Sequence, residues 1–150
     1  MMTVTVRPVR PEDQEIIVSY IRQAKINPRN LHWEHFLVAE EDGKPIGIRQ
    51  VKIHKKGTRK VASGFVLPAY RRQGISAQLM NEILKREQGP LYLMCRDKRA
   101  TYYEQFGFQQ VPVKQLPADF RQEYWIGRIV TTLISMFSNE RVRILPMKRG

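Results

Sequence analysis

Hydrophobic residues recur at helical spacing over three long segments of the chain. The spacing predicts helices over residues 11–24, 74–86 and 117–137, each with one apolar stripe. Two shorter helices are expected over residues 30–35 and 98–105. In the last long helix the apolar stripe consists of Ile126, Ile129, Val130, Leu133 and Phe137.

Short apolar or alternating segments predict strands between these helices. They cover residues 3–6, 36–40, 45–54, 61–67, 91–95, 108–113 and 141–148. Turn signals at Asp42-Gly43 and Lys56-Gly57 predict that the second, third and fourth strands form an antiparallel meander. The segment 91–95 is apolar throughout, so we expect it to be buried on both faces and parallel to the strand before the preceding helix.

The order of these elements predicts a mixed α/β fold. A chain of 150 residues, 42% of them hydrophobic, fits one globular domain over residues 1–150. We expect one twisted sheet of about seven strands, flanked by helices, with an extra helix near the C-terminus. No membrane span is expected, since the longest apolar stretch, residues 125–137, is too short to cross a bilayer.

The chain is strongly basic and carries a single cysteine. Lys and Arg number 26 against 14 Asp and Glu, for a net charge of +12. The densest basic cluster, at residues 55–60, contains no aromatic residue, which favours a solvated basic surface over a nucleic-acid site. Cys95 has no intrachain disulfide partner, which suggests the reducing cytoplasm, and no metal site is expected.

Residues 66–76 combine a strand end, a short loop with one glycine and a helix start. Unpaired N–H groups at a helix start can hold an anion, and Gly74 lets the backbone approach a ligand closely. Arg71 and Arg72 add positive charge. The segment contains neither a Walker A loop nor a dinucleotide fingerprint, but instead reads Arg71-x-x-Gly74-x-Ser76.

A second motif, YYEQFGF at residues 102–108, follows downstream. Together the two motifs resemble the GNAT superfamily of N-acetyltransferases. Its pyrophosphate signature is [QR]-x-x-G-x-[GA] after a strand of V-x-P-x-[YF]-R type, and its later signature is an aromatic pair, then x-x-hydrophobic-G-[FY]. The resemblance covers about residues 4–113. It implies a GNAT-like domain and an acetyltransferase that uses acetyl-CoA as its acetyl donor.

The resemblance also implies which residues bind the cofactor. Backbone groups of Phe65, Val66 and Leu67 are expected to bond the pantetheine arm at a place where the family's sheet splays open. The pyrophosphate is expected in a cradle of backbone N–H groups from Arg72, Gln73, Gly74, Ile75 and Ser76, beside Arg71. Two positions depart from the family pattern: Ser76 replaces Gly or Ala, and Arg96 replaces a frequent Asn and becomes a candidate phosphate contact.

Amine acetylation requires a base for the amine and an acid for the leaving thiolate. By the resemblance Tyr103 is the acid, since a tyrosine of ordinary pKa about 10 keeps its proton at neutral pH. His54, near the end of a strand, is the candidate base, with Glu34, His35 and water as rivals. Tyr102 is interpreted as a core aromatic and Cys95 as a buried small hydrophobe rather than a nucleophile.

Three functions remain open from the sequence. The first is direct acetylation of a primary amine on a small molecule, with acidic acceptors such as amino acids favoured by the basic charge. The second is acetylation of a protein or peptide, and the third is a non-catalytic module that binds nucleic acid or regulates. We expect a monomer or homodimer, and a helix over residues 117–137 that covers the amine pocket, adds to the core or forms a dimer face.

Overall fold

The computed structural model describes residues 3–26 and 33–150. Within these residues, seven strands are hydrogen-bonded in the order β1-β2-β3-β4-β5-β7-β6, and four α-helices flank them, which confirms the predicted mixed α/β fold. The chain divides into two compact units. The first consists of residues up to 52 together with 61–88, and the second of residues 53–60 and 89–150. The prediction of a single domain stays a prediction.

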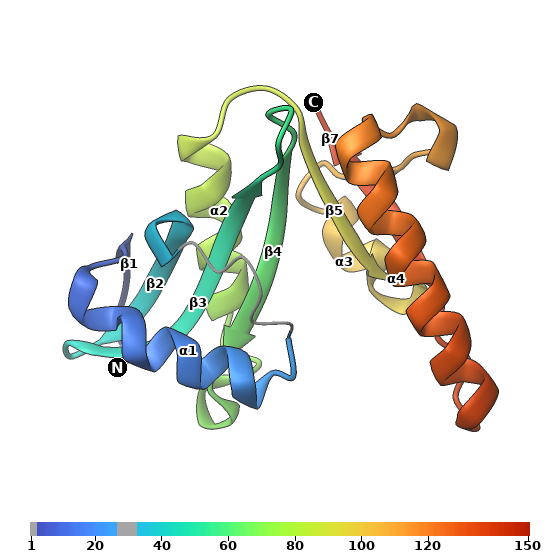
Figure 1. Ribbon diagram of the computed structural model, residues 1–150. Helices are drawn as coiled ribbons and strands as arrows, with labels where there is room; N and C mark the ends of the chain where they lie inside the picture. The colour runs from blue at the N-terminus through green and yellow to red at the C-terminus, as the bar shows by residue number, and fades with distance from the viewer. Residues whose placement is uncertain (1–2, 27–32) are drawn as a thin grey trace. The chain divides into compact units, whose positions relative to one another are not determined.

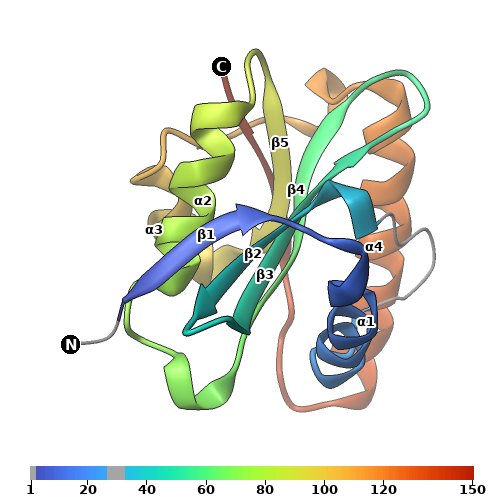
Figure 2. The ribbon, with the colours of Figure 1, turned by 90° about the vertical axis from the view of Figure 1, so that its left-hand side faces the viewer.

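The first unit is a sheet of antiparallel neighbours with one helix on each face (Figures 1 and 2). Its elements, of which β3 and β4 extend into the second unit, are β1 (Val4–Pro8), α1 (Gln14–Gln23), β2 (Phe36–Glu41), β3 (Lys44–Ile53), β4 (Arg59–Val66) and α2 (Ile75–Arg86). The turn between β2 and β3 has positive φ at both Asp42 and Gly43, as the Asp-Gly signal predicts.

Helix α1 closes the core of the first unit. Its buried residues Ile17, Tyr20 and Ile21 pack against Phe36 of β2 and Phe65 of β4. The hydroxyl of Tyr20 donates a hydrogen bond of 2.6 Å to the carbonyl oxygen of Pro45. On the opposite face, α2 buries the apolar side that its periodicity predicted, namely Ile75, Leu79, Met80 and Ile83.

The second unit contains β5 (Leu91–Arg96), α3 (Ala100–Glu104), β6 (Gln109–Gln110), α4 (Ala118–Phe137) and β7 (Ile144–Arg149). Strand β7 lies antiparallel between β5 and β6. The first residues of β4 pair in parallel with β5 through Lys60 and Tyr92, as expected from the apolar run. Helices α3 and α4 lie on opposite sides of β5 (Figure 2).

Some predicted boundaries are wrong. The strand expected over residues 108–113 is reduced to the two residues of β6, because Pro112 has no N–H for a ladder and a 3₁₀ helix, Val113–Gln115, follows it. β7 begins at Ile144 rather than at residue 141. The 3₁₀ helices Pro11–Asp13 and Asp97–Arg99 precede α1 and α3. Of the helix predicted over residues 30–35, a 3₁₀ turn at Trp33–His35 is described, and residues 30–32 lie outside the described residues.

Helix α4 forms where predicted but turns its apolar stripe outward. Ile126, Ile129, Val130, Leu133 and Phe137 are between 48% and 87% exposed. The face toward the sheet instead carries Phe120 and Tyr124, which pack with Tyr92 and Leu116, and then Gly127, Thr131 and Ser135. A Cβ on Gly127 would lie 3.2 Å from Cδ1 of Ile144, so glycine permits the helix to approach β7 closely.

A buried ion network ties the start of α1 to the sheet. Arg7 forms two hydrogen bonds with the carboxylate of Asp13, at 2.8 and 3.0 Å, and one with Glu40 at 2.7 Å. The backbone N–H of Arg10 donates to the same carboxylate of Asp13. The hydrogen bond from Arg7 holds the pKa of Asp13 below its ordinary value, against the opposing effect of burial.

We therefore expect Asp13→Asn to weaken the pH dependence of stability. Because the folded-state pKa of Asp13 is lowered, its contribution is present above the unfolded pKa of about 3.9 and is lost as pH falls through the folded-state value. Because Arg7 keeps its pairing with Glu40, loss of the charged Asp13 is expected to cost about 1.5–3 kcal/mol at pH 7. Urea unfolding between pH 7 and pH 3 measures both effects. The control is Glu12→Gln at an exposed position, and an equal pH slope in Asp13→Asn and wild type would contradict the assignment.

Candidate active site

The loop between β4 and α2 presents backbone N–H groups without backbone acceptors. Gly74 precedes the helix with φ +79°, and Arg72, two residues earlier, has φ +63°. Among the turn and loop hydrogen bonds of the described chain, none is donated by a backbone N–H of residues 72–76. A helix cannot satisfy the N–H groups of its own first turn, so these donors are available to an anion.

The space beside Gly74 is open. A Cβ built on Gly74 meets no atom within 4 Å, so packing inside the protein does not require glycine at this position. The left-handed φ does favour glycine, and Arg72 holds a similar conformation without that freedom. A loop whose N–H donors lack backbone acceptors and which has open space beside its glycine suits a bulky anion such as a diphosphate.

Hydrogen bonds from side chains and from the backbone hold the loop in place. Nε of Arg71 donates a 2.9 Å hydrogen bond to the carbonyl oxygen of Val66, and its guanidinium lies 5.5 Å from the ring centre of Phe65. The backbone N–H of Leu67 donates to the carbonyl oxygen of Ile46 on β3. The side-chain amide of Gln73 donates to Ala69. The structure thus brings the predicted residues 65–76 together in the first unit.

Sequence reasoning missed a buried arginine under this loop. Arg49, on β3, donates a 3.2 Å hydrogen bond from Nη1 to Oγ of Ser76 in the first turn of α2. Its guanidinium fits against Gly64, where an added Cβ would lie 2.9 Å from the Cζ of Arg49. Ser76, which departs from the family pattern, therefore has Arg49 as a hydrogen-bond partner. The sequence feature that could have indicated this contact was Gly64, because a glycine inside a strand often marks a place where another group approaches the backbone closely.

Tyr103 lies on α3 in the second unit and is buried. Its ring makes edge contacts with Tyr102, at 5.1 Å between ring centres, and with Phe108 at 6.4 Å. Its carbonyl oxygen accepts a 3.0 Å hydrogen bond from the N–H of Phe106, and Gly107 then turns the chain with φ +88°. The motif over residues 102–108 is thus a helix end that fixes the position of Tyr103.

His54 lies between β3 and β4, in the second unit, and faces α4. Its Nε2 is 3.0 Å from Oε2 of Glu123, whose other oxygen accepts a 2.5 Å hydrogen bond from Nζ of Lys60. Burial raises the pKa of Glu123, but His54 and Lys60 outweigh burial and hold that pKa at about 2. One turn earlier on α4, the carboxylate of Asp119 accepts hydrogen bonds from Thr58 and the Lys56 N–H.

Two other predicted residues are in different surroundings. Arg96 ends β5, is exposed and lies 3.8 Å from Glu140, a weak surface pair. Cys95 is buried beside Met147, with 3.6 Å between the sulfur atoms, and burial raises the pKa of its thiol. A raised pKa disfavours the thiolate, which agrees with a packing role. The rival bases Glu34 and His35 belong to the 3₁₀ turn at Trp33–His35.

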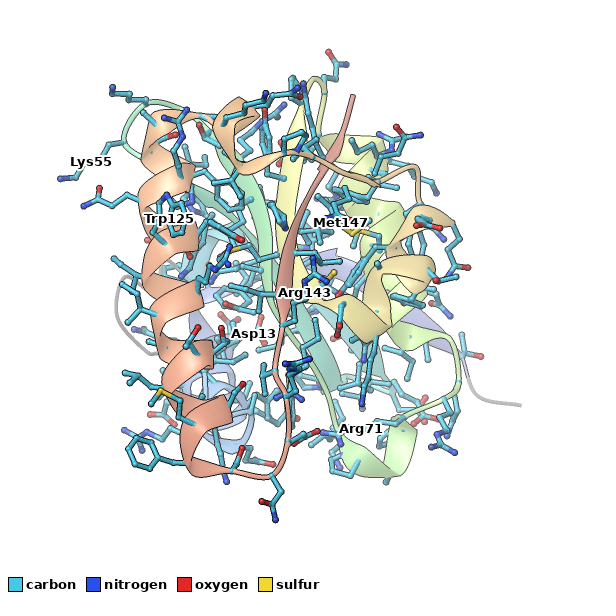
Figure 3. All side chains as sticks on the ribbon, turned by 90° about the vertical axis from the view of Figure 1, so that its right-hand side faces the viewer. Asp13, Lys55, Arg71, Trp125, Arg143 and Met147 are labelled. Atoms are coloured by element: carbon cyan, nitrogen blue, oxygen red, sulfur yellow. The ribbon has the colours of Figure 1, made fainter. Side chains whose placement is uncertain are left out.

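A cavity of about 540 Å³ in the second unit is lined by several positively charged side chains. Its walls come from α4, from the segment after β6 and from the chain that leads into β7 (Figure 3). They include three arginines, Arg128, Arg141 and Arg143, and four hydroxyl-bearing residues, but no carboxylate. Arg128 contacts the hydroxyl of Tyr124 at 3.4 Å. Within the described part of the chain, Arg141 and Arg143 form no ion pair. These arginines were not singled out from the sequence.

In residues 3–26 and 33–150, no cluster of three or more His, Cys, Asp or Glu side chains is suited to hold a metal ion. Over the same residues, no helix combines the length and the hydropathy that a membrane span needs.

Glu123→Gln is expected to destabilise the protein by about 1.5–3 kcal/mol, because it removes the charge that pairs with Lys60 and contacts His54. The pKa of Glu123 is lowered in the folded state, so its contribution is full above the unfolded pKa of 4.5 and fades as pH falls toward 2. Urea unfolding at pH 7 and pH 3 tests this. Glu140→Gln, at an exposed pair, serves as the control, and equal losses in the two variants would refute it.

Comparison with known proteins places the chain in a family. The model of the acetyltransferase (GNAT) domain matches residues 32–110, more than half of the chain. No curated protein matches the sequence. Rv2747 from Mycobacterium tuberculosis, in complex with CoA and NLQ, has a similar structure, with a TM-score of 0.70 and 18% identity over 97% of this chain and 98% of that one.

Two further solved structures share the fold. N-acetylglutamate synthase from Neisseria gonorrhoeae, complexed with coenzyme A and N-acetyl-glutamate, has a TM-score of 0.75 and 20% identity over 98% of this chain. The chain spans about a third of the length of that synthase, 35% in this complex and 33% in the complex with L-arginine. The ribosomal-protein-S18-alanine N-acetyltransferase from Escherichia coli has a TM-score of 0.61 and 16% identity, over 98% of this chain and 93% of that one.

The family model overlaps both the loop before α2 and the aromatic motif on α3, the two motifs on which the sequence-based resemblance depends. The chain belongs to the GNAT family of N-acetyltransferases, which use acetyl-CoA as the acetyl donor.

Proposed function

We propose that this acetyltransferase transfers the acetyl group directly to the primary amine of a small molecule that carries one or more carboxylates. The observation that carries the proposal is the arginine-lined cavity of the second unit. Guanidinium groups pair with carboxylates through two parallel hydrogen bonds, so Arg128, Arg141 and Arg143 provide a complementary surface. Among the described residues, the cavity walls contain no carboxylate, so the negative charge that pairs with these arginines is expected to come from a ligand.

The size of the cavity supports a small acceptor. Its volume of about 540 Å³ lies within the range of small-molecule pockets. Solved structures of similar fold include a synthase complexed with N-acetyl-glutamate, which bears two carboxylates. The S18-alanine acetyltransferase, also similar in fold, acts on a protein, so acetylation of a protein or peptide is the second candidate. Membership in an acetyltransferase family favours both over a non-catalytic module.

For the cofactor, we assign the diphosphate to the backbone N–H groups of residues 72–76. These donors and the open space at Gly74 fit that group. The hydrogen bond from Arg49 to Ser76 holds the first turn of α2 in place behind them. Backbone groups of residues 65–67 are assigned to the pantetheine arm, and Arg96 remains a candidate phosphate contact. A cytoplasmic location, suggested by the free thiol of Cys95, is part of the same proposal.

Acetyl-CoA supplies an activated acetyl group and is released as a thiol. As the amine nitrogen attacks the carbonyl carbon and the carbon–sulfur bond breaks, Tyr103 gives its hydroxyl proton to the departing sulfur. The amine loses its proton to a base, for which we propose His54. The contact with Glu123 fixes the orientation of the His54 ring, as a carboxylate does for a catalytic histidine.

Tyr103→Phe is expected to lower kcat about 100-fold or more, since general acid catalysis typically contributes 10²–10⁴. Because the change removes one hydroxyl and keeps the ring packing, the affinity for CoA should stay within a factor of three. Steady-state release of free CoA thiol and calorimetric titration with CoA measure the two quantities. Tyr102→Phe is the matched control and should keep full activity. Equal kcat values for Tyr103→Phe and Tyr102→Phe would remove Tyr103 from this role.

An acceptor screen tests the substrate class. Acidic amino acids, neutral amino acids, polyamines and peptides are offered with acetyl-CoA, and CoA release is followed. We expect turnover with acidic amino acids, and Arg143→Gln should raise their KM about tenfold to a hundredfold, because a charge-assisted hydrogen bond contributes about 1.5–3 kcal/mol. Lys55→Gln, which removes an exposed charge outside the cavity, is the control. Turnover with peptides alone would favour the second candidate.

A further inference from the structure

The outer face of α4 carries a continuous apolar surface. Eight large side chains on this face are between 47% and 87% exposed: Trp125, Ile126, Ile129, Val130, Leu133, Ile134, Met136 and Phe137. They form two adjacent rows along the helix, at positions 125, 129, 133, 136 and 126, 130, 134, 137. With 1.5 Å of rise per residue, the surface is about 18 Å long. We call it the α4 outer face.

This surface is larger than the apolar patches that a typical monomer exposes to solvent. From the exposed fractions, these side chains present about 900 Å² to water, whereas the largest apolar patch on a typical monomer covers about 300–600 Å². A standard protein interface buries about 800 Å² on each partner. The exposed area of the α4 outer face is therefore comparable to the area that each partner buries in a standard interface.

The charge pattern indicates what covers it. Residues 129–138 contain no charged side chain, in a chain whose net charge is +12. Arg128 lies over the ring of Trp125 at one edge of this face, but residues 129–138 offer no basic group that would attract an acidic partner or a nucleic acid. Two copies of a strongly basic chain repel each other wherever their charged surfaces meet. An uncharged apolar face is the surface on which they can touch without opposing like charges.

We propose that the α4 outer face is the interface of a homodimer, in which the α4 helices of two copies pack against each other about a two-fold axis. A two-fold contact is self-complementary, since the same patch is used by both copies. In an antiparallel pair, the centre of the stripe, near Val130 and Leu133, lies at the axis. The exposed Met136 and Phe137 of each copy then cover Trp125 and Ile126 of the other.

The dimer explains why α4 is apolar on its outer side. A helix that is apolar away from its own sheet is normally buried by something else. The inner face is already occupied by packing on β7, by the ion pair of Glu123 with Lys60 and by the hydrogen bonds of Asp119. The inference does not depend on the proposed acceptor or on the catalytic roles.

Light scattering coupled to size exclusion tests the proposal. At about 50 µM we expect a mass twice the chain mass of 17.7 kDa. Leu133→Lys places like charges opposite each other at the axis and should weaken dimerisation about 100-fold or more, giving the monomer. Gln88→Lys adds the same charge at an exposed position outside α4 and should remain dimeric.

A second measurement does not depend on the folding of that variant. In a Trp33→Phe background, the fluorescence of Trp125 should shift to longer wavelength on dilution, as the dimer separates and exposes the indole. A monomer at 50 µM, or a dimer that persists in folded Leu133→Lys, would overturn the proposal. So would a monomer that binds sedimenting lipid vesicles in place of its copy, which would make α4 a membrane-surface helix.

Discussion

The N–H groups of the first turn of a helix have no acceptors within that helix, and the diphosphate site that we propose at α2 depends on this constraint. At α2 the chain neither caps these groups nor fills the space before them. Instead it holds Arg72 and Gly74 at positive φ, a backbone conformation of the kind that forms anion-binding concavities from successive N–H groups. Arg71 and Arg49 keep the end of β4 and the start of α2 in place, which leaves the donors fixed before a ligand arrives.

In α4, polar contacts and one glycine, rather than the apolar stripe, determine which side of the helix faces the sheet. Glu123 and Asp119 bind the turn between β3 and β4, and Gly127 lets the helix approach β7. These contacts set the rotation of the helix about its axis. The stripe that periodicity identifies then lies outside, and Thr131 and Ser135 line the arginine cavity. One rotation thus produces both the arginine-lined cavity and the outer face that we assign to dimerisation.

The local structure of the two motifs could be predicted, because it depends on residues that are neighbours in the sequence. The loop at residues 71–76 and the motif at residues 102–108 each consist of a local turn, a glycine and a helix end, and all of these have sequence signals. Arg49, Arg128 and Arg143 could not be predicted, because their roles arise from contacts with residues far along the chain. Scattered arginines in a basic sequence do not show which of them converge.

The sequence by itself determined the order of strands and helices, the mixed α/β class and the family, because hydrophobic period and turn chemistry act over a few residues. Only the tertiary structure decided which side of α4 is buried, that β6 stops after two residues, and which charges share a cavity. The physical reason is that burial and electrostatic pairing depend on distances in space. Periodicity defines an apolar face, but the partner that covers the face is chosen by packing.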